Sequence, residues 1–320
     1  AAPVLYEDAY LYYIEGNGWR AEFSKSDGWL ERLVTTGHQH ASDLTYTGGN
    51  FIPDYQPSAR TTQPFSTGVD LLSEPLRPNF YRAVTDNDDG AGLHYRSGVW
   101  RDPGLKLKDI KASRTDRGVS VEAEYSMEKV GAVLKMSYLL NSEGEIAVTE
   151  HMIPGKDQEV NPLLRFGMTM AMPGRFDRVR YYGYGPHENY ADRSRSAMIG
   201  LYSADVEDLY QYDYVRPQES GARTGLRYWK VVDRIGRGLE ISASVPFTAT
   251  SLNYSTEDLD LASPTYVRHP SELVPREDTY VSFDLRQMGL GCVTSWGALP
   301  LEQYMLPYGE YTFEFIIKIL

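Results

Sequence analysis

The sequence predicts an all-β fold in the form of a large antiparallel sandwich, and three observations support this prediction. Apolar and polar residues alternate with a period of two in many segments, and turns containing glycine, proline or aspartate separate these segments. Long segments with helical periodicity are absent, so the strands lack the helical crossovers that a parallel sheet requires. The 320 residues can bury a substantial core, and all-β units of this length can form one domain.

The predicted strands follow from the alternation, because successive side chains of a strand point to opposite faces of its sheet. In Val119–Tyr125, apolar or aromatic side chains alternate with serine and glutamate, and in Tyr311–Ile319 they line one face opposite threonine, glutamate and lysine. The remaining strands are predicted at Trp19–Phe23, Trp29–Val34, Ala132–Leu140, Glu145–Met152, Leu163–Met172, Arg178–Tyr182, Leu239–Val245, Thr248–Tyr254 and Thr279–Leu285.

Two segments depart from the strand pattern. Ser255–Ala262 predicts one short helix, with Ser255 or Thr256 as its cap and acidic residues in its first turn. Residues 39–67 are rich in threonine, serine, glycine, proline and glutamine and have no clear periodicity. We therefore expect a surface insertion near 39–67.

Composition and charge exclude several classes of partner. The formal net charge is −12, whereas phosphate backbones and anionic membranes attract basic surfaces. No run approaches the ~20 apolar residues of a membrane span. Cys292 is the single cysteine, so an intrachain disulfide cannot form, and its sequence context favours a small buried side chain over a reactive thiol. We expect neither a nucleic acid nor a membrane as a partner.

Four motif segments carry most of the functional information in this sequence. Asn79–Gly90 reads NFYRAVTDNDDG, Gly183–Arg193 reads GYGPHENYADR, and Val215–Arg223 reads VRPQESGAR. The fourth, Gln287–Gly297, reads QMGLGCVTSWG. In this order they resemble the C-terminal region (the small chain, or domain 5) of bacterial β-galactosidases of glycoside hydrolase family two, whose last motif is close to QMG-x-GGDDSWG.

The resemblance extends roughly from Gly16 to the C-terminus and implies a fold. Residues 16–320 would form one β-supersandwich domain like that of galactose mutarotases, and residues 1–15 would be a tail from the preceding domain. One departure lies in the fourth motif, where Cys292, Val293 and Thr294 stand at the family's usual Gly-Asp-Asp.

Trp296 is the candidate substrate-binding residue. It lies in a glycine-bracketed loop between two predicted strands. A tryptophan on such a loop can present a flat apolar face to the C–H face of a sugar while its indole N–H finds a polar partner. Burial in the chain's own core is the alternative role, since tryptophan is usually highly buried. The resemblance implies that Trp296 contacts the sugar or the aglycone.

Asp88 and Gly90 belong to a cluster of acidic and amide residues that could bind calcium or form a tight turn. The spacing does not match an EF-hand loop, and we favour a turn in which the side chains bond nearby backbone N–H groups. The resemblance implies that Asp88 and Gly90 lie in a loop at the rim of the active site. Gly90, Gly92 and Gly98 would then supply hinge freedom to Gly90–Pro103.

His187 and Glu188 form a second, weaker candidate site. A histidine beside a carboxylate could act as base and acid in sugar ring opening, the mutarotase reaction. The same residues, with Asp192 and Arg193, could instead hold a turn together, and we favour this structural role.

The resemblance implies a function that depends on other parts of a longer protein. A retaining glycosidase needs two carboxylates about 5 Å apart, and the family keeps both on a TIM barrel that precedes this region. The chain has no βα repeats, so we expect no catalytic residue in it. It would complete the substrate pocket of a retaining β-galactosidase that hydrolyses terminal non-reducing β-D-galactose residues, and the isolated chain would be inactive.

The expected partners are the catalytic barrel and other domains of the same enzyme, a β-galactoside substrate, and further copies in a homo-oligomer. The family's magnesium and sodium sites lie on other domains, so we expect no metal or other cofactor in this chain. The complete protein would be located in the cytoplasm or periplasm of a bacterium. Two alternatives remain open: a free-standing aldose mutarotase or epimerase, and a carbohydrate-binding module without catalysis.

Overall fold

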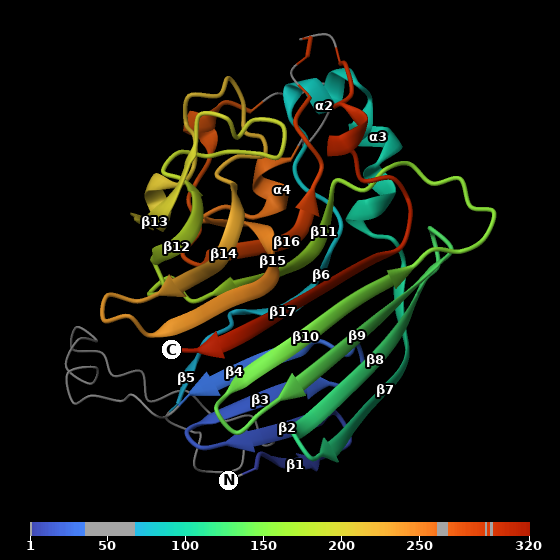
Figure 1. Cartoon of the computed structure of the whole chain (residues 1–320), viewed down its shortest axis with the longest axis vertical. Coiled ribbons are helices and arrows are strands. Elements are labelled where there is room, and N and C mark those ends of the chain that lie inside the picture. The colour runs from blue at the N-terminus through green and yellow to red at the C-terminus, as the bar shows by residue number, and fades with distance from the viewer. Residues whose placement is uncertain (1, 36–67, 261–267, 292, 295–296) are drawn as a thin grey trace.

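The computed structural model describes residues 2–35, 68–260, 268–291, 293–294 and 297–320 and shows an almost entirely antiparallel β architecture (Figure 1). All strand pairings in this part of the chain are antiparallel, and they connect three groups of strands into one continuous sheet system. The prediction of a large all-β antiparallel sandwich is confirmed. No helix in the described ranges has both the length and the apolar character needed to cross a membrane.

The first group is an N-terminal sheet, whose strands neighbour each other in chain order. Residues 4–16 form two strands of this sheet, because residues 4–7 pair with residues 12–15 and residues 11–16 pair with residues 19–24. The domain boundary expected between the tail 1–15 and residues 16–320 stays a prediction. The insertion expected near 39–67 lies almost wholly outside the described residues. The strands of this group are β1 (Val4–Glu7), β2 (Leu11–Gly16), β3 (Trp19–Ser24), β4 (Leu30–Thr35) and β5 (Val69–Asp70).

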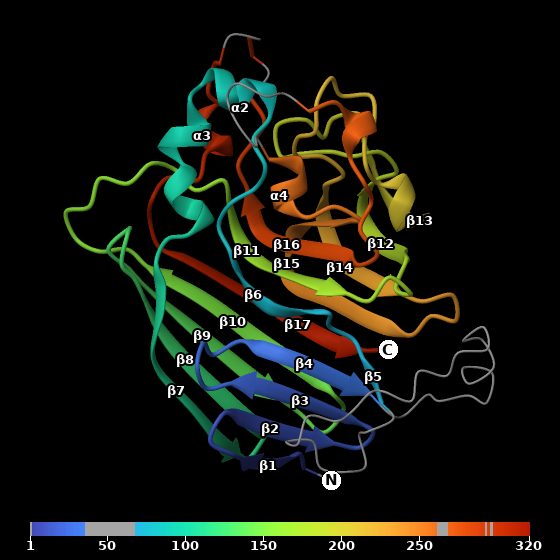
Figure 2. The same cartoon turned by 180° about the vertical axis from the view of Figure 1, so that it is seen from behind.

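The second group packs across the first and closes the core between them (Figures 1 and 2). The alternation seen in the sequence sets its register, with Val121 opposite Tyr138 and both side chains buried. Aromatic residues from the last strand complete the core, including Phe313 and Phe315. The strands are β7 (Leu105–Thr115), β8 (Gly118–Met127), β9 (Ala132–Leu140), β10 (Glu145–Ile153) and β17 (Tyr311–Ile319).

The third group forms the wall on which the functional segments are placed. Its longest strand joins two sheets, because residues 239–243 pair with β17 and residues 248–252 pair with β16. The two strands predicted at 239–245 and 248–254 are therefore one strand. The group consists of β6 (Glu74–Asn79), β11 (Arg165–Met172), β12 (Arg178–Gly185), β13 (Met198–Asp205), β14 (Arg223–Val232), β15 (Gly238–Leu252) and β16 (Thr279–Gln287).

Helices are short and occur in the connections. The predicted helix begins where expected, with Ser255 as the N-cap and Asp258 closing a reciprocal capping box. The predicted end at Ala262 is wrong, because the helix ends at Leu259 and the backbone of Asp260 is already extended. The helical segments are α2 (Asp86–Gly90), α3 (Leu93–Arg96), η2 (Gly98–Arg101), η3 (Val206–Asp208), α4 (Thr256–Leu259), η4 (Pro270–Glu272) and η5 (Glu302–Tyr304).

A carboxyl group is buried in the core of the second group. Glu150 on β10 is fully buried, stands opposite Phe313 and Met136, and has no hydrogen-bond partner among the described residues. Burial, with a contribution from Asp284, raises the pKa of Glu150 well above its usual range. The neutral acid is therefore the favoured form in the folded chain.

Replacing Glu150 should stabilise the protein and change its pH dependence. A raised folded-state pKa gives stability that is complete below the ordinary glutamate value of about 4.3 and is lost as the pH rises. Glu150→Met should therefore raise the unfolding free energy at neutral pH by at least about 1 kcal/mol, with the gain shrinking on acidification. Urea unfolding between about pH 5 and pH 8 measures this difference.

Glu145, at the exposed end of the same strand, provides the matched control. Hydrogen bonds from Asn141 and Lys318 lower the pKa of Glu145, so its contribution to stability has the opposite sign and fades on acidification. Glu145→Gln should leave stability unchanged or slightly lower at neutral pH. A Glu150→Met protein that is less stable than the wild type at neutral pH would contradict the assignment.

Candidate functional site

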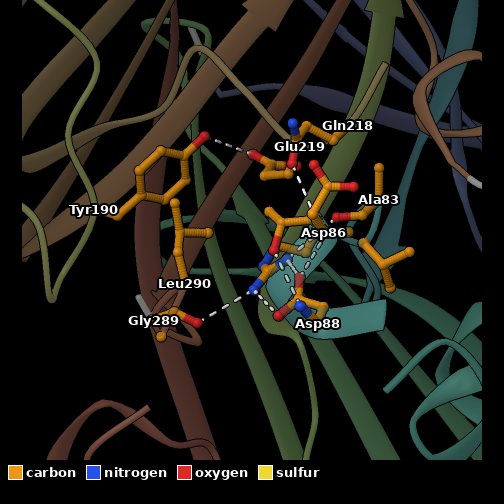
Figure 3. A network of polar contacts seen from close by, with 12 residues as sticks. Ala83, Asp86, Asp88, Tyr190, Gln218, Glu219, Gly289 and Leu290 are labelled. Carbon is orange, nitrogen blue, oxygen red and sulfur yellow. Dashed lines mark hydrogen bonds and ion pairs between the residues drawn. The ribbon is translucent and has the colours of Figure 1, made fainter. Parts of the chain in front are cut away.

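The four motif segments of the sequence meet in one polar junction beside the third group of strands (Figure 3). Asp192 of the second motif accepts hydrogen bonds from the backbone N–H groups of Leu290 (3.0 Å) and Gly291 (2.9 Å) in the fourth. Arg82 of the first motif donates to the carbonyl oxygen of Gly289, at 3.2 Å. Segments far apart in the chain are thus fixed against each other by side chain to backbone bonds.

A buried ion pair lies at the centre of the junction. Arg82 is completely buried and donates through both Nη1 and Nη2 to the carboxylate of Asp88, which is 2% exposed. Although burial opposes it, the Asp88 charge raises the pKa of the Arg82 guanidinium above its usual range. The guanidinium therefore stays charged and paired with Asp88, and it is not available as an acid or base near neutral pH.

Asp88 also fixes the start of α2 (Asp86–Gly90), which we call the rim segment because the resemblance implies that it lies at the rim of the active site. Its carboxylate accepts the N–H of Thr85 (2.8 Å), and the Thr85 hydroxyl accepts the N–H of Asp88 (3.2 Å), so α2 begins with a capping box. The cluster forms this one-turn helix, and Gly90 is its last residue. Among the glycines expected to act as hinges, Gly92 has a positive φ of 72°, whereas Gly90 and Gly98 do not.

The third motif attaches to the same helix from the other side. Arg216 pairs with the carboxylate of Asp86, and the N–H of Asp86 donates to Oε1 of Gln218 at 3.2 Å. Glu219 follows in the chain and is nearly buried. It accepts a long hydrogen bond of 3.5 Å from the hydroxyl of Tyr190 in the second motif.

His187 and Glu188 lie at the edge of the junction, and no contact joins their side chains in the described part of the chain. The His187 ring bonds Ser196 at 3.0 Å and faces solvent. The Glu188 carboxylate accepts the N–H of Gly221 (2.7 Å) and also contacts Arg193. These bonds fit the structural role, and the acid–base role for the pair stays a prediction.

Trp296 lies outside the described residues. Its neighbour Gly297 is described and shows which segment the end of the fourth motif approaches. Gly297 has a φ of 81°, and a Cβ atom built on it would lie 2.2 Å from the carbonyl carbon of Gly90. Only glycine can approach the end of α2 so closely. The structure therefore brings the chain next to Trp296 against the predicted rim segment.

A cavity of about 690 Å³ opens beside the junction on the other side of the first motif. Tyr81 and Ala83 line it, whereas Arg82 between them reaches the junction. No histidine is among the described residues that line this cavity, and His187 lies elsewhere. The mutarotase alternative required a histidine with an acid on the concave face. In the described ranges, no group of three or more histidine, cysteine or acidic side chains is arranged to hold a metal ion.

Comparison with known proteins identifies the family of this chain. The model of the beta-galactosidase small chain matches residues 57–317. The chain belongs to this family. A beta-galactosidase of Halalkalibacterium halodurans is 34% identical over 257 residues, which cover 79% of the chain and 25% of that protein. A beta-galactosidase of Priestia megaterium is 32% identical over 291 residues, which cover 89% of the chain and 27% of that protein.

The small-chain region thus spans about a quarter of the length of these relatives. Among solved structures, a galactose mutarotase related enzyme from Lactobacillus acidophilus aligns over 97% of both chains, with a TM-score of 0.46 and 8% identity. At that score the likeness carries no conclusion about function.

The sequence did not indicate which residues join the motifs. Arg82, Asp192 and Gln218 make the bonds between segments, yet each lies inside its motif as an ordinary polar residue. An arginine between the apolar residues of FYRAV, followed six residues later by an aspartate, was a sequence signal for the central ion pair.

Proposed function

We propose that this chain is the non-catalytic C-terminal domain of a family-two β-galactosidase and completes the substrate pocket of a TIM barrel located elsewhere in the enzyme. The observation that carries the proposal is the contact between Gly90 and Gly297, which joins the rim segment to the chain next to Trp296. Membership of the small-chain family supports it. The complete enzyme would hydrolyse terminal non-reducing β-D-galactose residues with retention of configuration.

The bonding of the junction acids supports a non-catalytic role. Retention requires two carboxyl groups about 5 Å apart, one of them free to attack the sugar. Three described acids of the junction are already engaged: Asp88 with Arg82, Asp192 with backbone N–H groups, and Glu188 with Gly221. Their bonds serve to position loops.

The chain would hold the loops at the opening of the pocket in place and would supply an apolar face for the substrate. Trp296 would stack on the sugar or the aglycone, and α2 with the loop after it would flank the opening of the pocket. Magnesium and sodium sites would lie on other domains of the complete enzyme, which we propose to be a homo-oligomer. The cavity beside the junction lacks a histidine among its described residues, so no observation favours the mutarotase reaction.

The isolated 320-residue chain should hydrolyse no β-galactoside, because both reacting carboxylates would be missing. The measurement is turnover of a chromogenic galactoside by the purified chain, with the complete enzyme as a positive control. Turnover above a buffer blank that co-purifies with the chain would refute the non-catalytic role.

In the complete enzyme, Trp296→Ala should weaken substrate binding because a stacking face is lost. If the contact is similar in the ground and transition states, KM should rise about tenfold while kcat changes little. Trp296→Phe is the control, since it keeps an aromatic face and should retain most of the affinity. A fall in melting temperature with unchanged KM would show that Trp296 belongs to the core instead.

A further inference from the structure

The cavity beside the junction has the volume of a ligand site, and the sheet at its base carries polar side chains. Its volume of about 690 Å³ falls within the range of small-molecule pockets. The floor is an area of sheet in which Thr169, Ser282 and Thr250 stand side by side on β11, β16 and β15. The Thr169 and Ser282 hydroxyls bond each other at 3.1 Å. A row of hydroxyl groups at the floor of a cavity suits a polar ligand.

Arg165 is the most unusual residue of this cavity. It begins β11 and is only 2% exposed, and its guanidinium donates no hydrogen bond of normal length to any described residue. Its nearest acidic atoms are Oε2 of Glu219 at 3.7 Å and Oδ2 of Asp284 at 3.6 Å, both too distant for a hydrogen bond. A guanidinium carries five N–H donors, and leaving them unsatisfied in a buried place is costly. A molecule in the cavity would satisfy them.

Acceptors and hydroxyls close to Arg165 are also under-used. Both carboxylate oxygens of Asp284 lack a hydrogen-bond partner among the described residues, as does the buried Thr250 hydroxyl. Glu219 receives only the 3.5 Å bond from Tyr190. The lining of the cavity thus includes a donor at Arg165, an acceptor at Glu219 and a hydroxyl at Thr250, whereas Asp284 lies outside the lining. This combination matches the hydroxyl groups of a ligand, since each hydroxyl both donates and accepts.

The charges around the cavity point to a neutral ligand. The lining arginines are nearly balanced by acids, and Arg101 is already paired with Asp260 at 3.0 Å. Arg165 already pairs with Glu219 at 3.7 Å and with Asp284 at 3.6 Å, so an anion would compete with these two acids for its guanidinium. Half-buried Trp29 and nearly buried Tyr254 add apolar surface to the walls. Hydroxyl groups combined with apolar C–H faces define a saccharide.

We propose that this cavity is a second site, for a neutral saccharide, in which Arg165 donates to and Glu219 accepts from the sugar hydroxyls. Its described lining includes no residue of 86–90 and none of the described residues of 287–297, whereas residues 100–103, at the end of the loop after α2, do line it. Tyr81 and Ala83 face this site, whereas Arg82 between them belongs to the junction. The proposal does not depend on the proposed function of the Trp296 loop.

Isothermal titration calorimetry of the 320-residue chain with D-galactose, D-glucose and lactose tests the site. At least one of these neutral sugars should bind saturably, and galacturonate should bind more weakly than galactose. Thr250→Val is the main variant, because it replaces an unbonded hydroxyl by a methyl group of similar size. It should weaken binding roughly threefold to tenfold while the melting temperature stays the same or rises.

Arg165→Gln should weaken binding more than tenfold, since a hydrogen bond from a charged donor is stronger than one from a neutral donor. If Arg165→Gln fails to fold, the sugar affinity of the Thr250→Val variant still tests the proposal. Thr149→Val on β10, which does not line the cavity, is the control variant and should leave affinity unchanged. The proposal is overturned if no neutral sugar binds, if galacturonate binds more tightly, or if Trp296→Ala abolishes binding that Thr250→Val leaves intact.

Discussion

The buried Arg82–Asp88 pair is the interaction on which the junction depends. A charged guanidinium with no exposure must find acceptors within the protein, and here they are the Asp88 carboxylate and the Gly289 carbonyl. The first bond fixes α2, and the second fixes the start of the fourth motif. Because one side chain holds both, the contact between Gly90 and Gly297 follows from the ion pair. Asp192 and Gln218 then secure the remaining motifs to this frame.

The strands that the sequence predicted are those whose two faces differ in environment. In β8, β9, β10 and β17 one face is buried and the other is exposed, so alternation was clear. In β13 the apolar Ile199 and Leu201 are exposed, whereas Tyr202 and Ala204 on the other face pack against the core. Apolar residues therefore stand on both faces, and the sequence shows no clear alternation. β15 was divided in the prediction at Val245 and Pro246, where the strand is exposed as it passes from β17 to β16. Proline is tolerated there because residue 246 has no partner in either register.

The candidate site was predictable only where residues are close in sequence. The motifs indicated Asp88, Gly90 and Trp296 through a family resemblance, and the structure brings Gly90 against the neighbour of Trp296. The cavity could not be predicted in this way, because Arg165, Glu219 and Thr250 come from separate parts of the chain and meet only after the sheet has formed. One signal was present, an arginine inside the apolar run that becomes β11. An isolated charge in a buried strand requires a partner, and that requirement is visible before the partner is known.

Hydrogen exchange on Arg82→Met tests most directly whether one side chain holds both segments. In the wild type the N–H groups of Ala91 and Gly291 are bonded, to Asn87 and to Asp192 respectively. If Arg82 is the common anchor, both groups should lose protection together in the variant, while amides of β8 and β9 remain unchanged. Loss of protection in only one of the two segments, or in neither, would contradict the account.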